Sequence, residues 1–422
     1  MCDTFWAPGA ARSFFGKNSD RKPAEPQAVC ILPRAPESPR SSVTGGELPY
    51  PDKGYAVLLS KPSWIRGGEI GLNEKGVAIG NEAVFSKWPA RKDGILGMDF
   101  LRIALRSASS AQEAVEILVE LTERFDQGGN GAYRGRLYYH NSYLAAGFDG
   151  AFVLETAGKR WAWKKVEGPS AISNSYSIGL DYKRLDAETR KAISPVNEKM
   201  ACYDEADAGR IGEKESWKPY VESRLHAFLT QGDSRRRAVE GRLAAAGPGL
   251  DLAVVLDTLR SRSLPDPGRP GKTAVICAHD GDNLGYPTTA SLAVEYDPAG
   301  GRCVAWFTGT SYPDISLYKP VLLSKGEFSP LWTGYEYSED APASLEYWKR
   351  GRDLYRRGGK ILSRDPEFRR ARDSAQERLR EAASRAGTDG IEAARKDVAR
   401  IVSDWEASFD LSGRGAPRQP SA

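Results

Sequence analysis

The chain has 422 residues, enough for one large domain or two smaller ones, and its formal net charge is only +4. This weak charge balance argues against nucleic acid as a partner. No run of about 18 apolar residues and no apolar N-terminal segment is present, so a soluble, cytoplasmic protein without a membrane partner is expected.

The first third of the sequence is typical of short strands separated by polar turns. Strands are predicted at residues 2–6, 13–17, 28–32 and 55–60, with a hairpin over 68–81 and a Pro-rich surface excursion at 33–51. Two helices follow. The first is predicted at 98–107, and the second begins after Ser110 as N-cap, with Glu113 completing a capping box.

Strand patterns return after the helices, at 143–146, 151–155, 161–166 and 171–174. The middle of the chain is more charged and predicts helices at 234–246 and 250–261, before further strands at 273–278, 290–296 and 303–308. Residues 341–409 are rich in Arg, Glu and Ala and predict helices. Within this section, 367–409 predicts a helix pair with exposed charged faces, which packs on the body or, as the alternative, binds a partner or a second subunit.

This order predicts an α/β fold in which two stacked antiparallel sheets lie between helix layers, because hairpins rather than single helices join the strands. We expect one catalytic domain over residues 1–325, a helical extension over 326–410 and a disordered tail over 411–422.

Five cysteines are scattered through the chain without paired spacing, which is neither a disulfide framework nor a zinc pattern. They are Cys2, Cys30, Cys202, Cys277 and Cys303. With only three histidines in the sequence, a His-rich metal site is hard to build, and no metal or cofactor is expected.

Cys2 follows the initiator Met1 directly, so removal of Met1 gives a residue that carries both a thiol and a free α-amine. Such an amine has a pKa near 8 and a free thiol one near 8.5, so the amine can act as base for the thiol. One residue then supplies nucleophile and base. On position alone, an ordinary buried cysteine is the alternative.

The polar cluster that ends at Asp20 is the next candidate. If residues 2–6 and 13–17 form a hairpin, Lys17 and Asp20 return beside Cys2, where a cation lowers the pKa of the thiol and a carboxylate orients the amine. The alternative is a solvent-facing turn, because Asn18, Ser19 and Asp20 are all turn residues.

Two motifs at the start of the chain, Met1-Cys2-Asp3-Thr4-Phe5 and Phe15-Gly16-Lys17-Asn18-Ser19-Asp20-Arg21, carry a family resemblance. They resemble the opening of the secernins and their bacterial cysteine dipeptidase relatives, which are N-terminal nucleophile hydrolases distantly related to bile salt hydrolases and penicillin V acylases. Segments that resemble later signatures of the family lie at 71–83, 139–142, 153–159, 172–174, 288–291 and 306–310.

The resemblance implies that Cys2 is the nucleophile and that Asp20 holds the catalytic amine and thiol in place. Lys17 stands where the acylases carry an arginine; secernin-like sequences share the lysine, which lacks the two-pronged contact of Arg.

The same resemblance implies that Asn81 and Asn174 stabilise the oxyanion. Each asparagine on its own is equally consistent with a turn or strand-end partner. Arg235 corresponds to a late arginine of the family, with its neighbours as alternatives in register and a solvated helix face as the alternative role.

Two other patterns are weaker. Cys277 and His279 lie two residues apart and suggest a Cys–His nucleophile pair, although a buried strand cysteine is favoured there. Asp280-Gly281-Asp282-Asn283 hints at calcium ligands but lacks the rest of such a loop, so a turn is predicted.

These observations predict a cysteine-dependent amide hydrolase that works through a Cys2 acyl-enzyme, and the family resemblance implies a dipeptidase that cleaves dipeptides or small amides. The alternatives are a non-catalytic, secernin-like regulatory or scaffold protein and an acyl transferase. The expected partner is a small peptide or amide substrate; a homo-oligomer is also consistent with the sequence.

Overall fold

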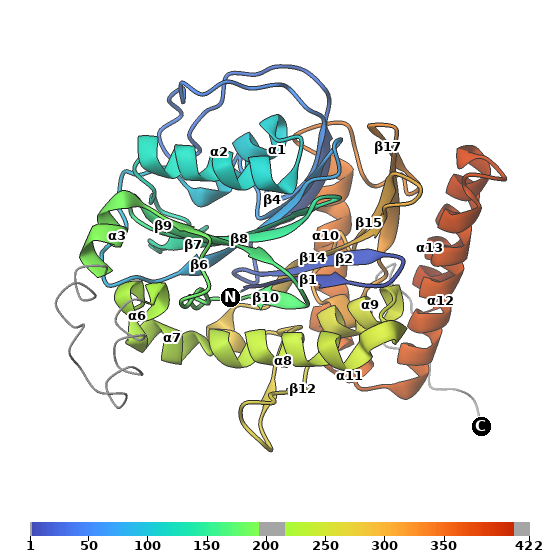
Figure 1. Ribbon diagram of the computed structural model, residues 1–422. Coiled ribbons are helices and arrows are strands. Elements are labelled where there is room, and N and C mark those ends of the chain that lie inside the picture. Colours follow the sequence, from blue (N-terminus) through green and yellow to red (C-terminus); the bar gives the residue numbers. More distant parts are fainter. Residues whose placement is uncertain (1, 194–215, 409–422) are drawn as a thin grey trace.

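The computed structural model describes residues 2–193 and 216–408. In this part of the chain two antiparallel sheets lie face to face between helical layers, so the predicted four-layer α/β arrangement is confirmed (Figure 1). Met1, Cys202 and the predicted tail at 411–422 lie outside the described residues.

The sheet that carries Cys2 has the strand order β10-β1-β2-β14-β15-β16-β17 within the described residues. Its strands are β1 (Cys2–Pro8), β2 (Ser13–Asp20), β10 (Ser170–Ile172), β14 (Thr288–Asp297), β15 (Arg302–Phe307), β16 (Lys319–Ser324) and β17 (Glu327–Pro330). The β1–β2 hairpin places Cys2 opposite Ser19. The alternative of a solvent-facing turn at residues 18–20 is therefore wrong, because these residues are buried at the end of β2.

The second sheet has the order β11-β9-β8-β7-β6-β5-β4-β3 over the same described ranges. Its strands are β3 (Gln27–Leu32), β4 (Val57–Pro62), β5 (Ile70–Asn73), β6 (Ala78–Val84), β7 (His140–Gly147), β8 (Gly150–Ala157), β9 (Arg160–Val166) and β11 (Arg184–Leu185). The predicted β5–β6 hairpin is confirmed: Asn73 Oδ1 accepts the N–H groups of Lys75 and Val77, and Gly76 takes a φ of 81° in the turn.

Both faces of the second sheet are buried, and alternate residues of its strands pack into different layers of the fold. Leu144 and Val153 belong to the hydrophobic cluster shared with the first sheet. Their neighbours Tyr143 and Leu154 belong to a separate cluster with helices α1 (Gly97–Ser107) and α2 (Ala111–Arg124). The gap between the sheets is therefore a packed interior.

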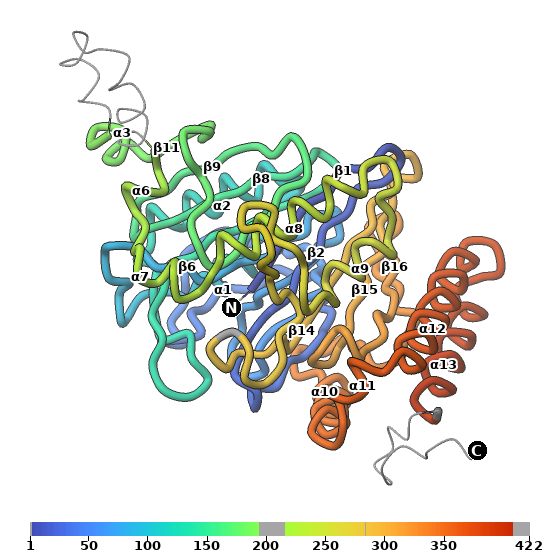
Figure 2. The backbone as a smooth tube through the Cα atoms, turned by 90° about the horizontal axis from the view of Figure 1, so that it is seen from below, coloured from blue at the N-terminus to red at the C-terminus, as the bar shows by residue number. Residues whose placement is uncertain are grey.

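Helices α1 and α2 cover the second sheet, while α8 (Gly232–Ala246) and α9 (Leu252–Arg260) cross the outer face of the first (Figures 1 and 2). Ser110 caps α2 as predicted, because its side chain accepts the N–H of Glu113. The Glu113 carboxylate, however, accepts from the N–H of Ser109 rather than that of Ser110, so the predicted capping box forms only in part.

The remaining helices lie at the edges of the body. They are α3 (Ala187–Ile193), α6 (Trp217–Val221), α7 (Arg224–Thr230), α10 (Pro342–Leu354), α11 (Lys360–Leu362), α12 (Pro366–Arg385) and α13 (Ile391–Ser408). Helices α12 and α13 form a pair at one side of the molecule (Figure 2). The predicted boundary at residue 325 falls in the β16–β17 turn, and the sheet continues to Pro330.

One predicted strand is largely wrong. Of residues 273–278, only β13 (Thr273–Ala274) is a strand, paired with β12 (Leu264–Pro265) in a separate ribbon. The next residues do not continue the strand, because their backbone N–H groups donate to acceptors outside the ribbon. Ile276 N–H and Cys277 N–H donate to Ser261 O, and Ala278 N–H donates to Thr288 Oγ1.

Candidate active site

Cys2 lies at the start of β1, on the face that points towards the second sheet. Cys2 and Thr4 share that face because alternate residues of a strand do so, and Thr4 reaches Glu82 on β6. The thiol is buried with 5% of the residue exposed, and its Sγ accepts the backbone N–H of Asp20 at 3.4 Å. The β1–β2 register therefore brings Asp20 to Cys2, as the sequence predicted.

The nitrogen of Cys2 is held by Asn174, which follows β10. Asn174 Oδ1 accepts from Cys2 N at 2.6 Å, and Asn174 Nδ2 donates to Ala83 O at 2.8 Å. This nitrogen is the atom that becomes the α-amine when Met1 is removed. Asn174 thus bridges the two sheets at the nucleophile, with one amide hydrogen remaining beyond the bond to Ala83.

Arg235, in the first turn of α8, completes this arrangement. Its Nη2 donates to Asn174 Oδ1 at 2.7 Å, and its Nη1 donates to Cys2 O at 3.2 Å and to Asp3 Oδ2 at 2.7 Å. The residue is 2% exposed, so the alternative of a solvated helix face is wrong for Arg235. Arg236 and Arg237 pair with Glu240 and Asp266 instead.

The start of α8 can approach Asn174 only because residue 232 is a glycine. A Cβ on Gly232 would lie 2.6 Å from Ser175 Oγ and 2.7 Å from Ser175 N. A larger residue at position 232 would therefore clash with Ser175. The close packing of Gly232 against Ser175 helps to position Arg235, three residues later in α8.

Lys17 lies between the two sheets beside the nucleophile. Its Nζ donates to Glu82 Oε1 at 3.0 Å, and both side chains are fully buried. Burial opposes the positive charge of Lys17, but the charges of Cys2 and Glu82 outweigh it and raise the pKa of the lysine. Burial raises the pKa of Glu82 to about 7, with Lys17 opposing that shift.

Asp20 borders the site at a bulge in the neighbouring strand. The register of β14 against β2 shifts between Thr288 and Ala290, and Thr288 Oγ1 donates to Asp20 Oδ1 at 2.7 Å. Bulges commonly redirect a side chain towards an active site. Burial raises the pKa of Asp20 to about 6, although the charge of Arg235 opposes this.

Asn81 lies on β6 across the gap from Cys2. Its Nδ2 donates one hydrogen to Asn141 Oδ1 at 2.7 Å, while its Oδ1 is buried without a hydrogen-bond partner among the described residues. Because a side-chain amide carries two N–H hydrogens, Asn81 retains one that can stabilise an oxyanion. The bond to Asn141 fixes the amide plane.

These groups surround a cavity of about 260 Å³. Cys2, Asp20, Asn81 and Asn174 all border it, whereas Lys17 and Arg235 support it from behind. The structure therefore brings all six predicted site residues together: four border the cavity, Arg235 hydrogen-bonds Cys2 and Asn174, and Lys17 acts on Cys2 through its charge.

The thiol itself is not activated by its surroundings alone. Burial raises the pKa of Cys2, and the charge of Lys17 offsets this only in part. A base close to the sulfur is therefore required for attack at neutral pH.

Several contributors have no role predicted from the sequence, although three of them lie in the segments 71–83 and 139–142 that carry the family resemblance. Glu82 pairs with Lys17, Asn141 orients Asn81, and Glu69 and Tyr139 border the cavity. Glu82 had one usable signal, since a lone charge within the apolar residues of a strand has to find a buried partner. A single polar residue directly before a strand, such as Glu69, gives no sequence signal of a role in the site.

Cys277 and His279 do not form a nucleophile pair at this cavity. Cys277 Sγ donates to Asp314 Oδ1 at 3.1 Å, and His279 Nε2 bonds the two Asp314 oxygens at 2.9 Å each. The three side chains are buried, and their ligand-type atoms lie within 4.8 Å of one another, so they could hold a metal ion. Here they form a hydrogen-bonded cluster. Of residues 280–283, for which the sequence predicts a turn, 280–281 form one and Asn283 begins a short 3-10 helix, Asn283–Gly285.

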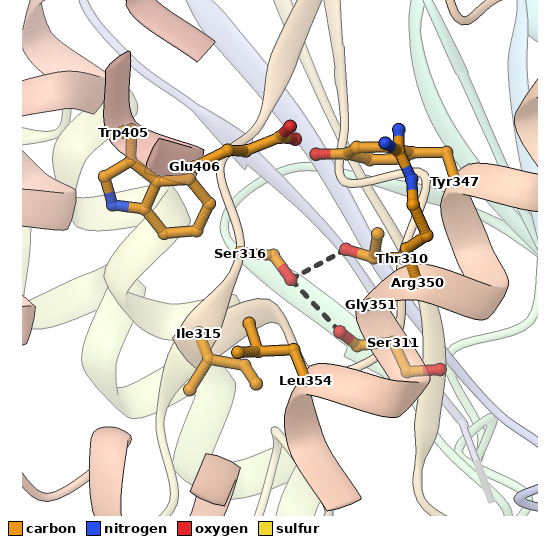
Figure 3. A pocket seen from close by; sticks show the side chains of 10 residues that line it. All are labelled: Thr310, Ser311, Ile315, Ser316, Tyr347, Arg350, Gly351, Leu354, Trp405 and Glu406. Atoms are coloured by element: carbon orange, nitrogen blue, oxygen red, sulfur yellow. Dashed lines mark hydrogen bonds between the residues drawn. The ribbon is translucent and has the colours of Figure 1, made fainter. Parts of the chain in front are cut away.

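A separate hollow of about 30 Å³ lies between the C-terminal helices and the body. Figure 3 shows the side chains that line it. Ser316 bonds Thr310 and Ser311 on one side of it, while Trp405 and Glu406 of α13 close another. Its volume fits about two water molecules, and no nucleophilic thiol borders it. The hollow belongs to the packing of α13.

No helix within residues 2–193 and 216–408 is long and apolar enough to cross a membrane.

No protein-family model matches the chain. Among solved structures, it is similar to a penicillin V acylase from Agrobacterium tumefaciens, with 13% identity over 78% of this chain and 92% of that chain and a TM-score of 0.43. It is also similar to the C2A mutant of the conjugated bile acid hydrolase from Clostridium perfringens, with 15% identity over 80% of this chain and 98% of that chain and a TM-score of 0.46. A third similar structure is the Caenorhabditis elegans ortholog of N-acylethanolamine-hydrolyzing acid amidase, with 13% identity over 70% of this chain and 93% of that chain and a TM-score of 0.36. At these identities and TM-scores, the function of this chain rests on its own residues.

Proposed function

We propose that this chain is an amide hydrolase of the N-terminal nucleophile type, and specifically a cysteine dipeptidase acting on dipeptides or related small amides in the cytoplasm. The observation that carries the proposal is the placement of Cys2. Its sulfur borders a cavity, while its nitrogen is held at 2.6 Å by Asn174 Oδ1. Nucleophile and prospective base are thus both positioned.

Acylation begins when the α-amine of mature Cys2 takes the proton of the thiol. The sulfur attacks the substrate carbonyl carbon, and the developing oxyanion accepts hydrogen bonds from the amides of Asn81 and Asn174. When the C–N bond breaks, the α-ammonium returns the proton to the leaving amine. Water then attacks the thioester, which releases the acid and restores the thiol.

Removal of Met1 follows from this chemistry. With Met1 attached, the nitrogen of Cys2 is a peptide amide that cannot take a proton. Burial raises the pKa of the thiol, and an unprocessed chain has no α-amine on Cys2 to take the proton of the thiol. We therefore propose that the unprocessed chain is inactive.

The size of the site supports a small substrate. A cavity of about 260 Å³ lies just below the range of roughly 300–1,000 Å³ that is usual for pockets binding drug-sized ligands. A dipeptide suits this space, and the resemblance of the opening motifs to cysteine dipeptidases supports the same class.

The test compares the mature protein with Cys2→Ser and Cys303→Ser on a panel of dipeptides and simple acyl amides. Cys303 is a matched control because it is another buried thiol of the same sheet, and burial raises its pKa. Turnover and a mass increase at Cys2 are expected in the wild type and in Cys303→Ser, and neither is expected in Cys2→Ser. Full turnover by Cys2→Ser would refute the proposal, and acyl transfer to an added amine without release of acid would assign a transferase instead.

A further inference from the structure

The cavity beside Cys2 has an acidic wall that the mechanism above leaves unused. Glu69 borders the cavity and is 4% exposed, and its Oε2 is buried without a hydrogen-bond partner among the described residues. Its Oε1 lies 3.5 Å from Arg21 Nη1, a long contact. A buried carboxylate oxygen without a donor is costly, so its position suits a donor that arrives with the ligand.

Arg21 balances this wall only in part. Its Nε donates to Glu25 Oε1 at 3.0 Å, and its Nη2 donates to the same oxygen and, at 2.8 Å, to Gly131 O. Trp64 Nε1 also donates to Glu25 Oε1, at 2.9 Å. Two carboxylates therefore share one guanidinium: Glu25 accepts two of its hydrogen bonds, and Glu69 receives only the long contact from Nη1.

Glu69 is also fixed beside the oxyanion site. The backbone N–H of Asn81 donates to Glu69 O at 3.2 Å, which ties the two residues together across the β5–β6 region. The charge of Glu69 acts on Cys2 as well, since it helps to raise the pKa of the thiol after burial.

Peptide geometry shows which ligand atom belongs here. In a dipeptide, bonds of about 1.46 and 1.52 Å join the α-nitrogen to the scissile carbonyl carbon, so these two atoms lie roughly 2.5 Å apart. A group that binds the α-ammonium must therefore lie next to the group that binds the carbonyl oxygen. Glu69 and Asn81 have this relationship.

We propose that Glu69 binds the α-ammonium of the residue that acylates Cys2, so that the enzyme selects substrates with a free amino terminus. This inference rests on the proposed function, because it assigns the orientation of the substrate in that site. It predicts that amides lacking the ammonium group are poor substrates although they fit the cavity.

The test uses L-alanyl-L-alanine and propionyl-L-alanine, which differ only in the ammonium group. Wild-type enzyme is expected to favour the dipeptide in kcat/KM by roughly 10- to 100-fold, the usual range for one hydrogen bond to a charged group. Glu69→Gln should lose this preference by lowering kcat/KM for the dipeptide alone. Glu295→Gln is the matched control, because it removes the charge of another buried carboxylate that pairs with an arginine, Arg12, but does not border the cavity, and it should keep the preference.

A binding measurement keeps the inference testable without turnover. Calorimetry on Cys2→Ala should show tighter binding of the dipeptide than of propionyl-L-alanine, and Cys2→Ala/Glu69→Gln should bind both alike. Equal kcat/KM for the two substrates in the wild type, with acylation of Cys2, would overturn the role of Glu69 and leave the proposed function standing. Selective binding without any acyl-enzyme would support the Glu69 site and overturn the hydrolase. Equal or absent binding of both compounds by Cys2→Ala would overturn the role of Glu69.

Discussion

The contact between Arg235 and Asp3 provides a stability prediction with a calculable size. The two side chains are 3% and 2% exposed, and Arg235 Nη1 lies 2.7 Å from Asp3 Oδ2. Arg235→Met keeps much of the length of the side chain but leaves the Asp3 carboxylate buried with only Ser173 Oγ as a described side-chain donor, at 2.7 Å. Removal of one partner from a buried pair costs roughly 3–5 kcal/mol in the free energy of unfolding.

Arg236→Met is the matched control, since Arg236 is the next residue of α8 but forms a partly exposed pair with Glu240. Its loss should cost only about 0.3–0.5 kcal/mol. Urea unfolding followed by tryptophan fluorescence and circular dichroism measures both changes. The double variant Asp3→Asn/Arg235→Met should be less destabilised than the sum of its single variants, because the unpaired charge is gone. Equal effects of the two arginine changes, or strict additivity with Asp3→Asn, would refute the assignment of a buried pair.

Three further predictions concern the site around Cys2. Asn81→Ala should lower kcat by about 10²-fold with little change in KM or in melting temperature, since it removes one preorganised oxyanion donor, and steady-state kinetics decide this. Glu82 has a pKa raised from its ordinary 4.5 to about 7, so the stability that its protonated form contributes is present below pH 4.5 and lost as the pH rises through 7. The unfolding free energy of the wild type should therefore fall relative to that of Glu82→Gln across this window, and a constant difference would contradict the shift. Cys2→Ser should melt near the wild type yet lose labelling by iodoacetamide at position 2 and orders of magnitude of activity, because a hydroxyl is far harder to ionise than a thiol.

The strand order of the first hairpin could be predicted, but its length could not. Asn18, Ser19 and Asp20 have the composition of a turn, yet they continue β2 because β14 pairs with them along the whole strand. The side chain of Asn18 also finds two backbone acceptors, Leu259 O at 2.8 Å and Ile276 O at 3.0 Å. Partners so distant in sequence leave no local signal.

The sequence also could not decide which arginine near residue 235 reaches the site. Successive residues of an α-helix point about 100° apart, so Arg235 and Arg236 differ entirely in surroundings although their local sequence is the same. The close approach of Gly232 to Ser175 brings the start of α8 to the site, where Arg235 is the residue that reaches Cys2. The motif indicated the region, and packing between distant segments decided the register.

Glu69 marks what single-sequence reasoning misses at the site itself. Glu69 lies far from Cys2 and Asp20 in the sequence, and no motif connects them. The three residues border one cavity only because the two sheets stack. The chemistry at Cys2 could be inferred from position and motif, whereas the wall that would select a substrate required the folded chain.

The account depends most on the free α-amine of Cys2. The decisive measurement is intact-mass analysis of purified protein, separated into forms with and without Met1, after brief exposure of each to a dipeptide substrate. We predict a thioester adduct on Cys2 and turnover in the form without Met1, and neither in the form that retains it. Equal acylation and turnover in the form that retains Met1 would contradict the central claim.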